Sequence, residues 1–552
     1  MRFLPLLVAV AAALALFAGL GATPYSDFRE ARDAAVAREI IARREPITPR
    51  YAGEPRFEKP IAAYAPEALV ALSGDQATAP FRSRALRAAL AVALLALVAS
   101  IGAGHFGARA GWLAALVLAT TLGLPLSART DGTQMLATLF GWIGCAGFAD
   151  ATFGRRAGRG ARLLVAWAGV AAALVVAGPL PALWPLATVA LYGALVRDRA
   201  VLGAVRPLAG LVFAAALALP WYGAMLDRHG LAFAAAAPFF PYAAEARAAW
   251  WTGLPLAAAL FVVACFPWIA LLPPSMAHAA TWWRAARPAL GRAATAAPPA
   301  SDASPAAREA REEHAAHFFI AALLAALAPI VAYPGPPLPA ALPALPAAAL
   351  LVGRFLDHLF EDDARLARPF GRAVFTVGAT GSVLAVACTV LATRLRDVAP
   401  ELRLLGALTL LASWAPFLAA FVGRRRFAAL LVALPVAVGA PVVALRLLPA
   451  MQETLSAWSV ADAMNRASPP LAPLVLVEEP PPSLRLYLER NAVLADDVTA
   501  ALTGWRAEDG LAYVAFRPLR EQRVAAGAPG PLEILWRTPG LVLARVHPEG
   551  LP

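Results

Sequence analysis

The chain has 552 residues, of which 60% are apolar and only 15% are charged. Its mean hydropathy of +0.63 excludes an ordinary soluble globular protein and indicates a polytopic membrane protein. The net charge of +12 does not predict nucleic-acid binding, because the arginines fall mainly in short loops between apolar segments, where they orient a membrane protein.

The apolar segments predict thirteen membrane spans, since about 20 apolar residues cross the hydrocarbon core. The expected spans are residues 3–22, 86–104, 111–128, 132–150, 162–178, 180–196, 206–226, 252–274, 317–333, 338–353, 372–392, 401–421 and 427–448. The region 162–196 is also compatible with one re-entrant pair. The first span resembles a signal peptide, but its apolar run is long, and we favour a retained transmembrane helix.

The loops predict the orientation of the spans. Loops after even-numbered spans are rich in arginine, whereas most loops after odd-numbered spans are short and poor in it. The positive-inside rule then places the amino terminus in the cytoplasm. With thirteen spans, the carboxy terminus lies outside.

The first outer loop, residues 23–85, is long and polar. Its pattern FREARDAAVAREIIARR predicts an amphipathic helix along the membrane surface, with Val36, Ile40 and Ile41 facing lipid. Residues 60–74 are expected to form a second helix of this kind.

The chain is expected to divide into a transmembrane domain, residues 1–449, and a soluble outer domain, residues 450–552. Within the first, the Ala/Pro/Arg/Glu-rich segment 280–316 is typical of a cytoplasmic linker. In the second, strands are expected at Leu474–Val477, Leu511–Phe516, Leu532–Arg537 and Leu541–Val546, and helices at Ser483–Arg490 and Pro518–Ala526. This alternation predicts a small α/β domain on the outer membrane face.

A single lysine, Lys59, stands among 47 arginines, within the run YAGEPRFEKPIAAY. An ammonium is a compact point charge with a tunable pKa, whereas a guanidinium is a broad fork that stays charged. The retained lysine suggests a task that arginine cannot perform. Chance in a composition-biased chain is the alternative interpretation.

The predicted topology gathers charged and polar residues on the outer side, where such residues are costly and usually functional. Carboxylates beside cations suit transfer chemistry on an anionic lipid carrier, because a cation neutralises a phosphate leaving group and a carboxylate accepts a proton from a hydroxyl. An orienting collar of salt bridges without chemistry is the alternative. The gathered residues are Asp27, Glu30, Arg32, Asp33, Glu58, Lys59, Arg129, Asp131, Tyr222, Asp227, Arg228 and His229.

The stretch REARDAAVAREIIARREPITPRYAGEPRFEKPIAAY resembles the first periplasmic loop of the ArnT-like lipid-to-lipid glycosyltransferases. These belong to glycosyltransferase family 39, within the GT-C fold class. Later motifs agree in order: SARTDG, VVAGPLPALWPL, LALPWYGAM, FPWIALLP, YPGPPLPAALPALPA and SLRLYLER. The matching loop residues are Glu30, Arg32, Ala34, Ala37, Arg38, Glu39, Pro49, Arg50, Gly53, Phe57, Glu58, Lys59 and Pro60.

The resemblance implies an α-helical polytopic membrane protein of the GT-C type, with a small C-terminal α/β periplasmic domain. It implies a multi-pass protein of the bacterial inner membrane. The implied reaction moves a sugar from a polyprenyl-phosphate donor, at the periplasmic face, to a lipid A-like or other lipid or glycan acceptor. We expect no cofactor and no metal, since Asp496 and Asp497 read as a solvated loop of the tail domain.

The resemblance also implies roles for individual residues. Lys59 matches the loop lysine that is associated with the donor phosphate, and Glu58 matches the acidic position beside it. Asp131 matches a structural or substrate-orienting carboxylate. Arg129 and Tyr222 belong to matching motifs and are further candidates for substrate binding.

Three carboxylates of the first loop are candidates for catalysis. Asp27 is preferred as the base, with Asp33 second and Glu30 third. A base is needed if the acceptor is a hydroxyl, whereas an acceptor phosphate is already a nucleophilic anion. The sequence leaves this choice open.

Several positions depart from the family pattern. Arg29 stands where the family has an aspartate, and Ala177 replaces a lysine. A further lysine and tyrosine fall at Pro337 and Ala341, and the stretch Phe239–Tyr242 replaces a histidine pair. These losses weaken phosphate binding as the family achieves it and argue against a metal held by those histidines.

Arg228, His229 and Tyr333 are the residues that would compensate for these losses, and Tyr333 is a further candidate for substrate binding. Two other functions stay open. One is a non-catalytic polytopic protein, either a lipid or solute transporter or a degenerate family member that only binds a lipid-linked sugar, although the sequence has no clear internal repeat. The other is a protein O-glycosyltransferase of the same fold.

Overall fold

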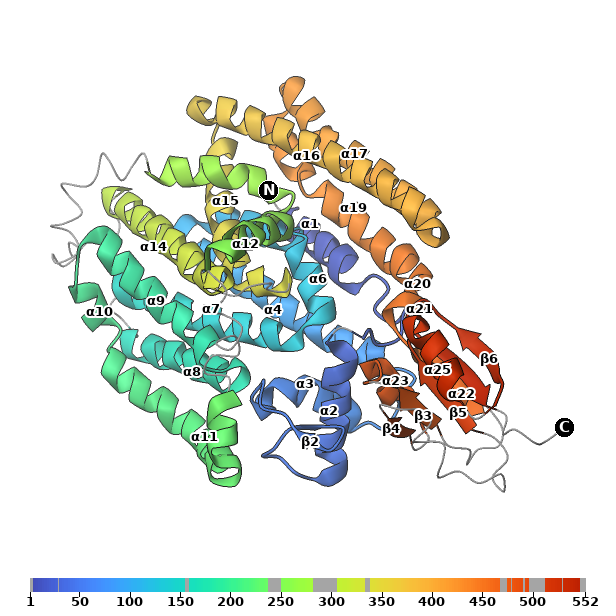
Figure 1. The fold of residues 1–552 in the computed structure, drawn as a ribbon. Helices are drawn as coiled ribbons and strands as arrows, with labels where there is room; N and C mark the ends of the chain where they lie inside the picture. The colour runs from blue at the N-terminus through green and yellow to red at the C-terminus, as the bar shows by residue number, and fades with distance from the viewer. Residues whose placement is uncertain are drawn as a thin grey trace.

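Apolar helices make up most of the chain before residue 450, and a small sheet domain follows at one end of them (Figure 1). This arrangement comes from a computed structural model. It describes residues 3–27, 29–153, 158–236, 250–280, 305–332, 338–466, 474–477, 479–489, 492–495, 512–528 and 530–546.

Nine helical segments within the described residues are long and apolar enough to cross a membrane. Two pairs of helices, bent by 59° and 102° at a short break, raise the number to eleven. The nine segments are α4 (Ala79–Phe106), α7 (Gly132–Phe153), α8 (Arg159–Ala177), α11 (Pro207–Ala236), α14 (Pro305–Ala332), η4 with α15 (Leu338–Ala344, Leu345–Phe360), α16 (Ala367–Arg394), α17 (Ala399–Phe421), and the run α18, α19, η7 and α20 (Arg425–Leu431, Leu434–Val442, Val443–Leu447, Leu448–Ala450). The bent pairs are α5 (Ala108–Ala119) with α6 (Gly123–Thr130), and α12 (Trp250–Cys265) with residues 268–280.

Each of the thirteen predicted spans coincides with an apolar helix, but two of these helices are short. They are α1 with η1 (Leu4–Ala12, Ala13–Phe17) and α9 (Pro179–Val196), whose apolar part is Pro181–Val196. The first is short because Ala18 leaves the helix in an extended conformation. The prediction therefore exceeds by these two the eleven spans found among the described residues.

Helix α11 is longer than the predicted span 206–226. It continues through a bend at Gly230. The φ of this residue is 52°, which glycine can adopt because it has no side chain to clash. His229, which lies beyond the predicted span, is therefore a helical residue, as is Tyr222 within it. The short helix α10 (Ala200–Ala204) precedes α11.

The first loop is folded. It contains α2 (Glu30–Arg43), a hairpin of β1 (Arg50–Tyr51) and β2 (Glu54–Pro55), then η2 (Ile61–Tyr64) and α3 (Ala65–Ala71). Helix α2 was predicted, but Val36 does not face lipid: it is buried against Tyr51, Ala63 and Tyr64, because the hairpin and η2 fold back over it. The second predicted helix of this loop corresponds to η2 and α3. Leu72, directly after α3, is exposed.

The predicted cytoplasmic linker 280–316 lies largely outside the described residues. Residues 281–304 are not described, and residues 305–316 are helical, because α14 already begins at Pro305.

The C-terminal part holds a five-stranded sheet of order β4-β3-β5-β7-β6. Strand β3 is parallel to both of its neighbours, whereas β7 is antiparallel to both of its own. The four predicted strands are confirmed, and β4 was not predicted because its four residues carry little pattern. The elements are α21 (Gln452–Leu455), α22 (Trp458–Arg466), β3 (Leu474–Val477), α23 (Pro482–Tyr487), β4 (Ala492–Ala495), β5 (Ala512–Phe516), η9 (Pro518–Arg520), α25 (Glu521–Gly527), β6 (Leu532–Arg537) and β7 (Val542–Val546).

Helix α23 docks this domain on the first loop, where the two lie side by side in Figure 1. The Asp27 carboxylate accepts a hydrogen bond from the Ser483 N–H at 2.7 Å, and the Asp27 N–H donates to the Leu455 carbonyl at 2.8 Å. We call this contact the loop–domain junction. Its further hydrogen bonds are Tyr25 N–H to Tyr487 Oη at 2.9 Å and Arg38 Nη1 to the Leu486 carbonyl at 2.6 Å.

Replacing Asp27 by alanine is expected to loosen the junction. The Ser483 N–H would lose its acceptor, at a cost of about 1–3 kcal/mol. Amide hydrogen exchange should then speed up in α23, while α7 keeps its protection. Asp75→Ala, at an exposed loop carboxylate, is the control. Unchanged exchange in α23 of the Asp27 variant would contradict this view of the junction.

Candidate functional site

The only lysine of the chain makes an ion pair with helix α2. Lys59 Nζ lies 2.8 Å from Asp33 Oδ2 and 3.0 Å from Asp33 Oδ1. The two side chains are only 15% and 14% exposed, and Nζ lies 5.8 Å from the centre of the Tyr64 ring. The ammonium is therefore held in a largely desolvated position, where its charge acts more strongly than in water.

The hairpin before Lys59 sets its place. Ala52 and Gly53 both have positive φ, 57° and 85°, which is the conformation of a tight two-residue turn. The Gly53 N–H donates to Glu39 Oε1 at 3.0 Å, which ties the turn to α2. The chain then returns along α2, and Pro60 leads into η2 directly after Lys59.

Asp131 is buried at the break between α6 and α7, with 1% exposure. It pairs with Arg29, and its Oδ1 accepts the Gln134 N–H at 2.9 Å. Burial alone would raise the pKa of Asp131, but the charges of Lys59 and Arg29 and the Gln134 N–H lower it below its usual value. Arg29, a departure from the family pattern, thus neutralises the carboxylate for which the resemblance implies a structural or substrate-orienting role.

Glu30 lies in a buried network with two arginines of α4. Arg84 Nη2 is 2.9 Å from Glu30 Oε2, and Arg87 Nη2 is 3.0 Å from Glu30 Oε1. Burial opposes ionisation, yet the two guanidinium groups lower the pKa of Glu30 to about 2. Both carboxylate oxygens are engaged, so the geometry favours a structural role for Glu30 over the predicted catalytic one.

Arg84 and Arg87 were not predicted as site residues. Their signal was present: two arginines, three residues apart, precede or enter an apolar helix and so share one face. Ser83 Oγ and Glu67 extend the network, with Glu67 Oε1 3.5 Å from Arg87.

The other predicted site residues lie in separate surroundings. Asp27 belongs to the loop–domain junction, where burial raises its pKa. Glu58 is exposed and pairs with Arg56. Tyr333 lies outside the described residues. Of the remaining two, Arg129 donates to the Ala18 carbonyl, and Tyr222 is buried and donates to the Leu174 carbonyl at 3.3 Å.

Two of the three residues proposed to compensate for the departures contact the first loop, and the third, Tyr333, lies outside the described residues. Arg228 pairs with Glu45, and His229 Nε2 lies 2.9 Å from Thr48 Oγ1. Both belong to α11, whose end therefore lies against the first loop on the side away from the C-terminal domain (Figure 1).

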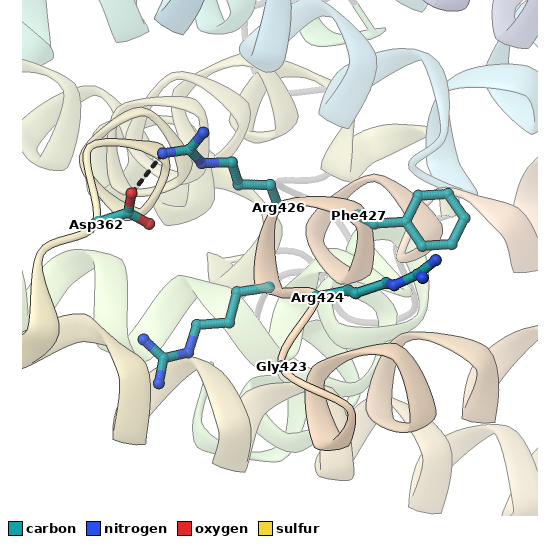
Figure 2. A pocket seen from close by; sticks show the side chains of 6 residues that line it. Asp362, Gly423, Arg424, Arg426 and Phe427 are labelled. Atoms are coloured by element: carbon teal, nitrogen blue, oxygen red, sulfur yellow. Dashed lines mark hydrogen bonds and ion pairs between the residues drawn. The ribbon is translucent and has the colours of Figure 1, made fainter.

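A cavity of about 540 Å³ lies elsewhere, between the end of α15 and the turn before α18. Figure 2 shows Arg426 directed at Asp362 across it. This turn begins the run α18–α20, whose other end leads into the C-terminal domain, so the cavity and the Lys59 site are at opposite ends of the bundle. Its lining residues are Asp362, Gly423, Arg424, Arg425, Arg426 and Phe427.

Replacing Glu30 by glutamine is expected to destabilise the protein by about 3–5 kcal/mol, because it leaves two buried guanidinium groups without their shared carboxylate. The wild type should also lose stability as the pH falls from 4.5 towards 2, since a carboxylate of lowered pKa stabilises the fold only while it is ionised. Thermal unfolding between pH 7 and 2 measures both effects.

Glu54→Gln, at an exposed position of the hairpin, is the control for this substitution. If Glu30→Gln unfolds like the control and keeps the same dependence on pH, the network does not have the importance that we assign to it.

Comparisons with known proteins identify the fold. No protein-family model matches the chain, and no curated protein matches it. Two solved structures of ArnT from Cupriavidus metallidurans are similar. The apo structure has 17% identity and a TM-score of 0.74, and the structure bound to undecaprenyl phosphate has 18% identity and a TM-score of 0.75. Each match covers 99% of this chain and 98% of the other.

These matches confirm the expected fold class, an ArnT-like polytopic GT-C fold with a small C-terminal sheet domain. At this level of identity the similarity establishes the fold only. The first loop of this chain lies between the bundle and the sheet domain, and it carries Lys59 and Asp33 there.

Proposed function

We propose that the protein is a membrane glycosyltransferase that takes its sugar from a polyprenyl-phosphate donor. The observation that carries this proposal is the desolvated Lys59–Asp33 pair on the first loop of an ArnT-like fold. In support, the similar ArnT structure is described as bound to undecaprenyl phosphate.

Transfer of the sugar from the donor is favoured by a cation beside the leaving phosphate. As the bond between the sugar carbon and the phosphate oxygen breaks, its electron pair stays on the phosphate, whose negative charge increases. A fixed ammonium in a site of low dielectric stabilises that charge. Lys59 is such a group. The donor phosphate would compete with Asp33, its present partner, for the Lys59 ammonium.

The acceptor oxygen then forms a bond with the sugar carbon. If the acceptor is a hydroxyl, its proton needs a base, and the geometry favours Asp33 over Asp27. Asp33 is beside Lys59 and is released when phosphate takes its place, whereas Asp27 is engaged by the Ser483 N–H at the loop–domain junction. If the acceptor is a phosphate, Asp33 only orients the ammonium.

We further propose that the site faces the periplasm of a bacterial inner membrane, with the amino terminus in the cytoplasm and a lipid A-like acceptor. The basic turn around Arg425 and the Lys59 site lie at opposite ends of the bundle, which fits the positive-inside rule in this orientation.

Replacing Lys59 by alanine is expected to lower sugar transfer by about 100-fold or more, the usual effect of losing a charge-stabilising group. Lys59→Arg is expected to restore little, since the broader guanidinium does not fit the same position beside Asp33. Transfer from a radiolabelled polyprenyl-phosphate sugar mixture in vesicles measures this. Arg43→Ala, at an exposed cation of α2, is the control.

Full activity of Lys59→Ala would contradict the assignment of the donor site. A wild-type protein that binds undecaprenyl phosphate but transfers no sugar would instead be a non-catalytic lipid-binding protein.

A further inference from the structure

Three arginines from separate segments surround the ring of Tyr51. Their guanidinium carbons lie 5.8–5.9 Å from the ring centre. Arg32 comes from α2, Arg56 follows β2, and Arg485 comes from α23 of the C-terminal domain. We call Arg32, Arg56, Arg485 and Tyr51 the arginine cluster.

The contacts within the arginine cluster do not offset the repulsion between its positive charges. Cation–π contacts at a partly exposed site are weak and do little against the mutual repulsion of three guanidinium groups. Arg56 is neutralised by Glu58. Neither Arg32 nor Arg485 has a carboxylate within ion-pair distance among the described residues.

The arginine cluster also contains hydrogen-bond donors that are not used. In the described part of the chain, the Nε atoms of all three arginines and the Tyr51 hydroxyl are buried without a hydrogen-bond partner. Tyr51 is only 9% exposed. Buried donors are normally satisfied, so four unused donors around one ring indicate a missing acceptor.

The surrounding charges define what the acceptor is. Burial together with the nearby Glu479 raises the pKa of Tyr51 above its usual value, although the three arginines oppose this, so the phenol stays a donor at neutral pH. With Glu58 and Glu479 counted against the three arginines, the cluster keeps a positive charge. Its ligand is therefore an anion with several acceptor oxygens.

We propose that the arginine cluster binds a phosphate group and that the C-terminal domain completes this site by supplying Arg485. Guanidinium forks match the oxygens of a phosphate geometrically and are stronger donors than neutral groups. The proposal rests on the proposed function, since it assigns the phosphate to one of that reaction's two substrates.

The position of Arg485 depends on how the domain docks. It lies in the short helix α23, two residues after Ser483, whose N–H is bound by Asp27. On the other side, Arg56 connects the cluster to the Lys59 site, because the charge of Asp33 also acts on it. The phosphate in the cluster is thus that of the sugar donor or that of a phosphorylated acceptor.

Binding measurements on the full chain in nanodiscs test the site and distinguish the two sources. Undecaprenyl phosphate is the probe for the donor, and monophosphoryl lipid A, compared with its dephosphorylated form, is the probe for the acceptor. Arg485→Gln is expected to weaken binding of one phosphorylated probe about tenfold. Binding of dephosphorylated lipid A should not change, and Arg485→Lys should lie between wild type and Arg485→Gln.

The matched control is Arg517→Gln, which removes an exposed arginine of the same domain. Arg32→Gln removes the cluster's cation from the opposite side and should weaken binding of the same probe, whether or not the Arg485 variant folds. Unchanged dissociation constants for both phosphorylated probes in the folded variants would overturn the proposal.

The two proposals fail differently in these experiments. A wild-type protein that binds phosphate through Arg485 but transfers no sugar refutes the transferase and leaves the phosphate site. Transfer that depends on Lys59, with normal binding in both Arg485→Gln and Arg32→Gln, refutes the phosphate site and leaves the transferase.

Discussion

The first loop keeps its shape because a buried carboxylate, Glu30, is shared by two buried arginines of the helix α4. Desolvating three charged groups is costly, and their mutual attraction compensates only when the geometry is good and no polar atom is left over. Arg84 meets this condition by also donating to the Leu20, Thr23 and Pro24 carbonyls. The network fixes where α2 starts against the bundle, and α2 in turn carries Arg32 and Asp33.

From that anchor, two sites develop on the same helix. Asp33, one turn after Glu30, holds Lys59, while Arg32 joins the arginine cluster that α23 completes. The loop therefore connects two bodies: the bundle through Glu30 and the C-terminal domain through Asp27. Helix α23 of the C-terminal domain thereby adds Arg485 to the two arginines that the loop itself places around Tyr51.

Much of the fold could be predicted from the sequence, because apolar length and alternation depend on local composition. All thirteen apolar segments are helical, and β3 and β6 begin and end at the predicted residues. The candidate site was less accessible. Val36 has the pattern of a lipid-facing residue, yet a hairpin 14 residues later covers it. The sequence ranks Asp27 above Asp33 and Glu30 as a base, but it does not show their partners, several of which come from distant segments such as α4 and α23. In the structure Asp27 binds the C-terminal domain, Glu30 is a structural anion, and Asp33 pairs with Lys59.

The central claim is that Lys59 holds the phosphate of a polyprenyl carrier. A structure of the full chain in nanodiscs with undecaprenyl phosphate tests it most directly. We expect phosphate oxygens about 3 Å from Lys59 Nζ, with the Asp33 carboxylate displaced from its present position. A phosphate bound away from the first loop, with the Lys59–Asp33 pair intact, would contradict it.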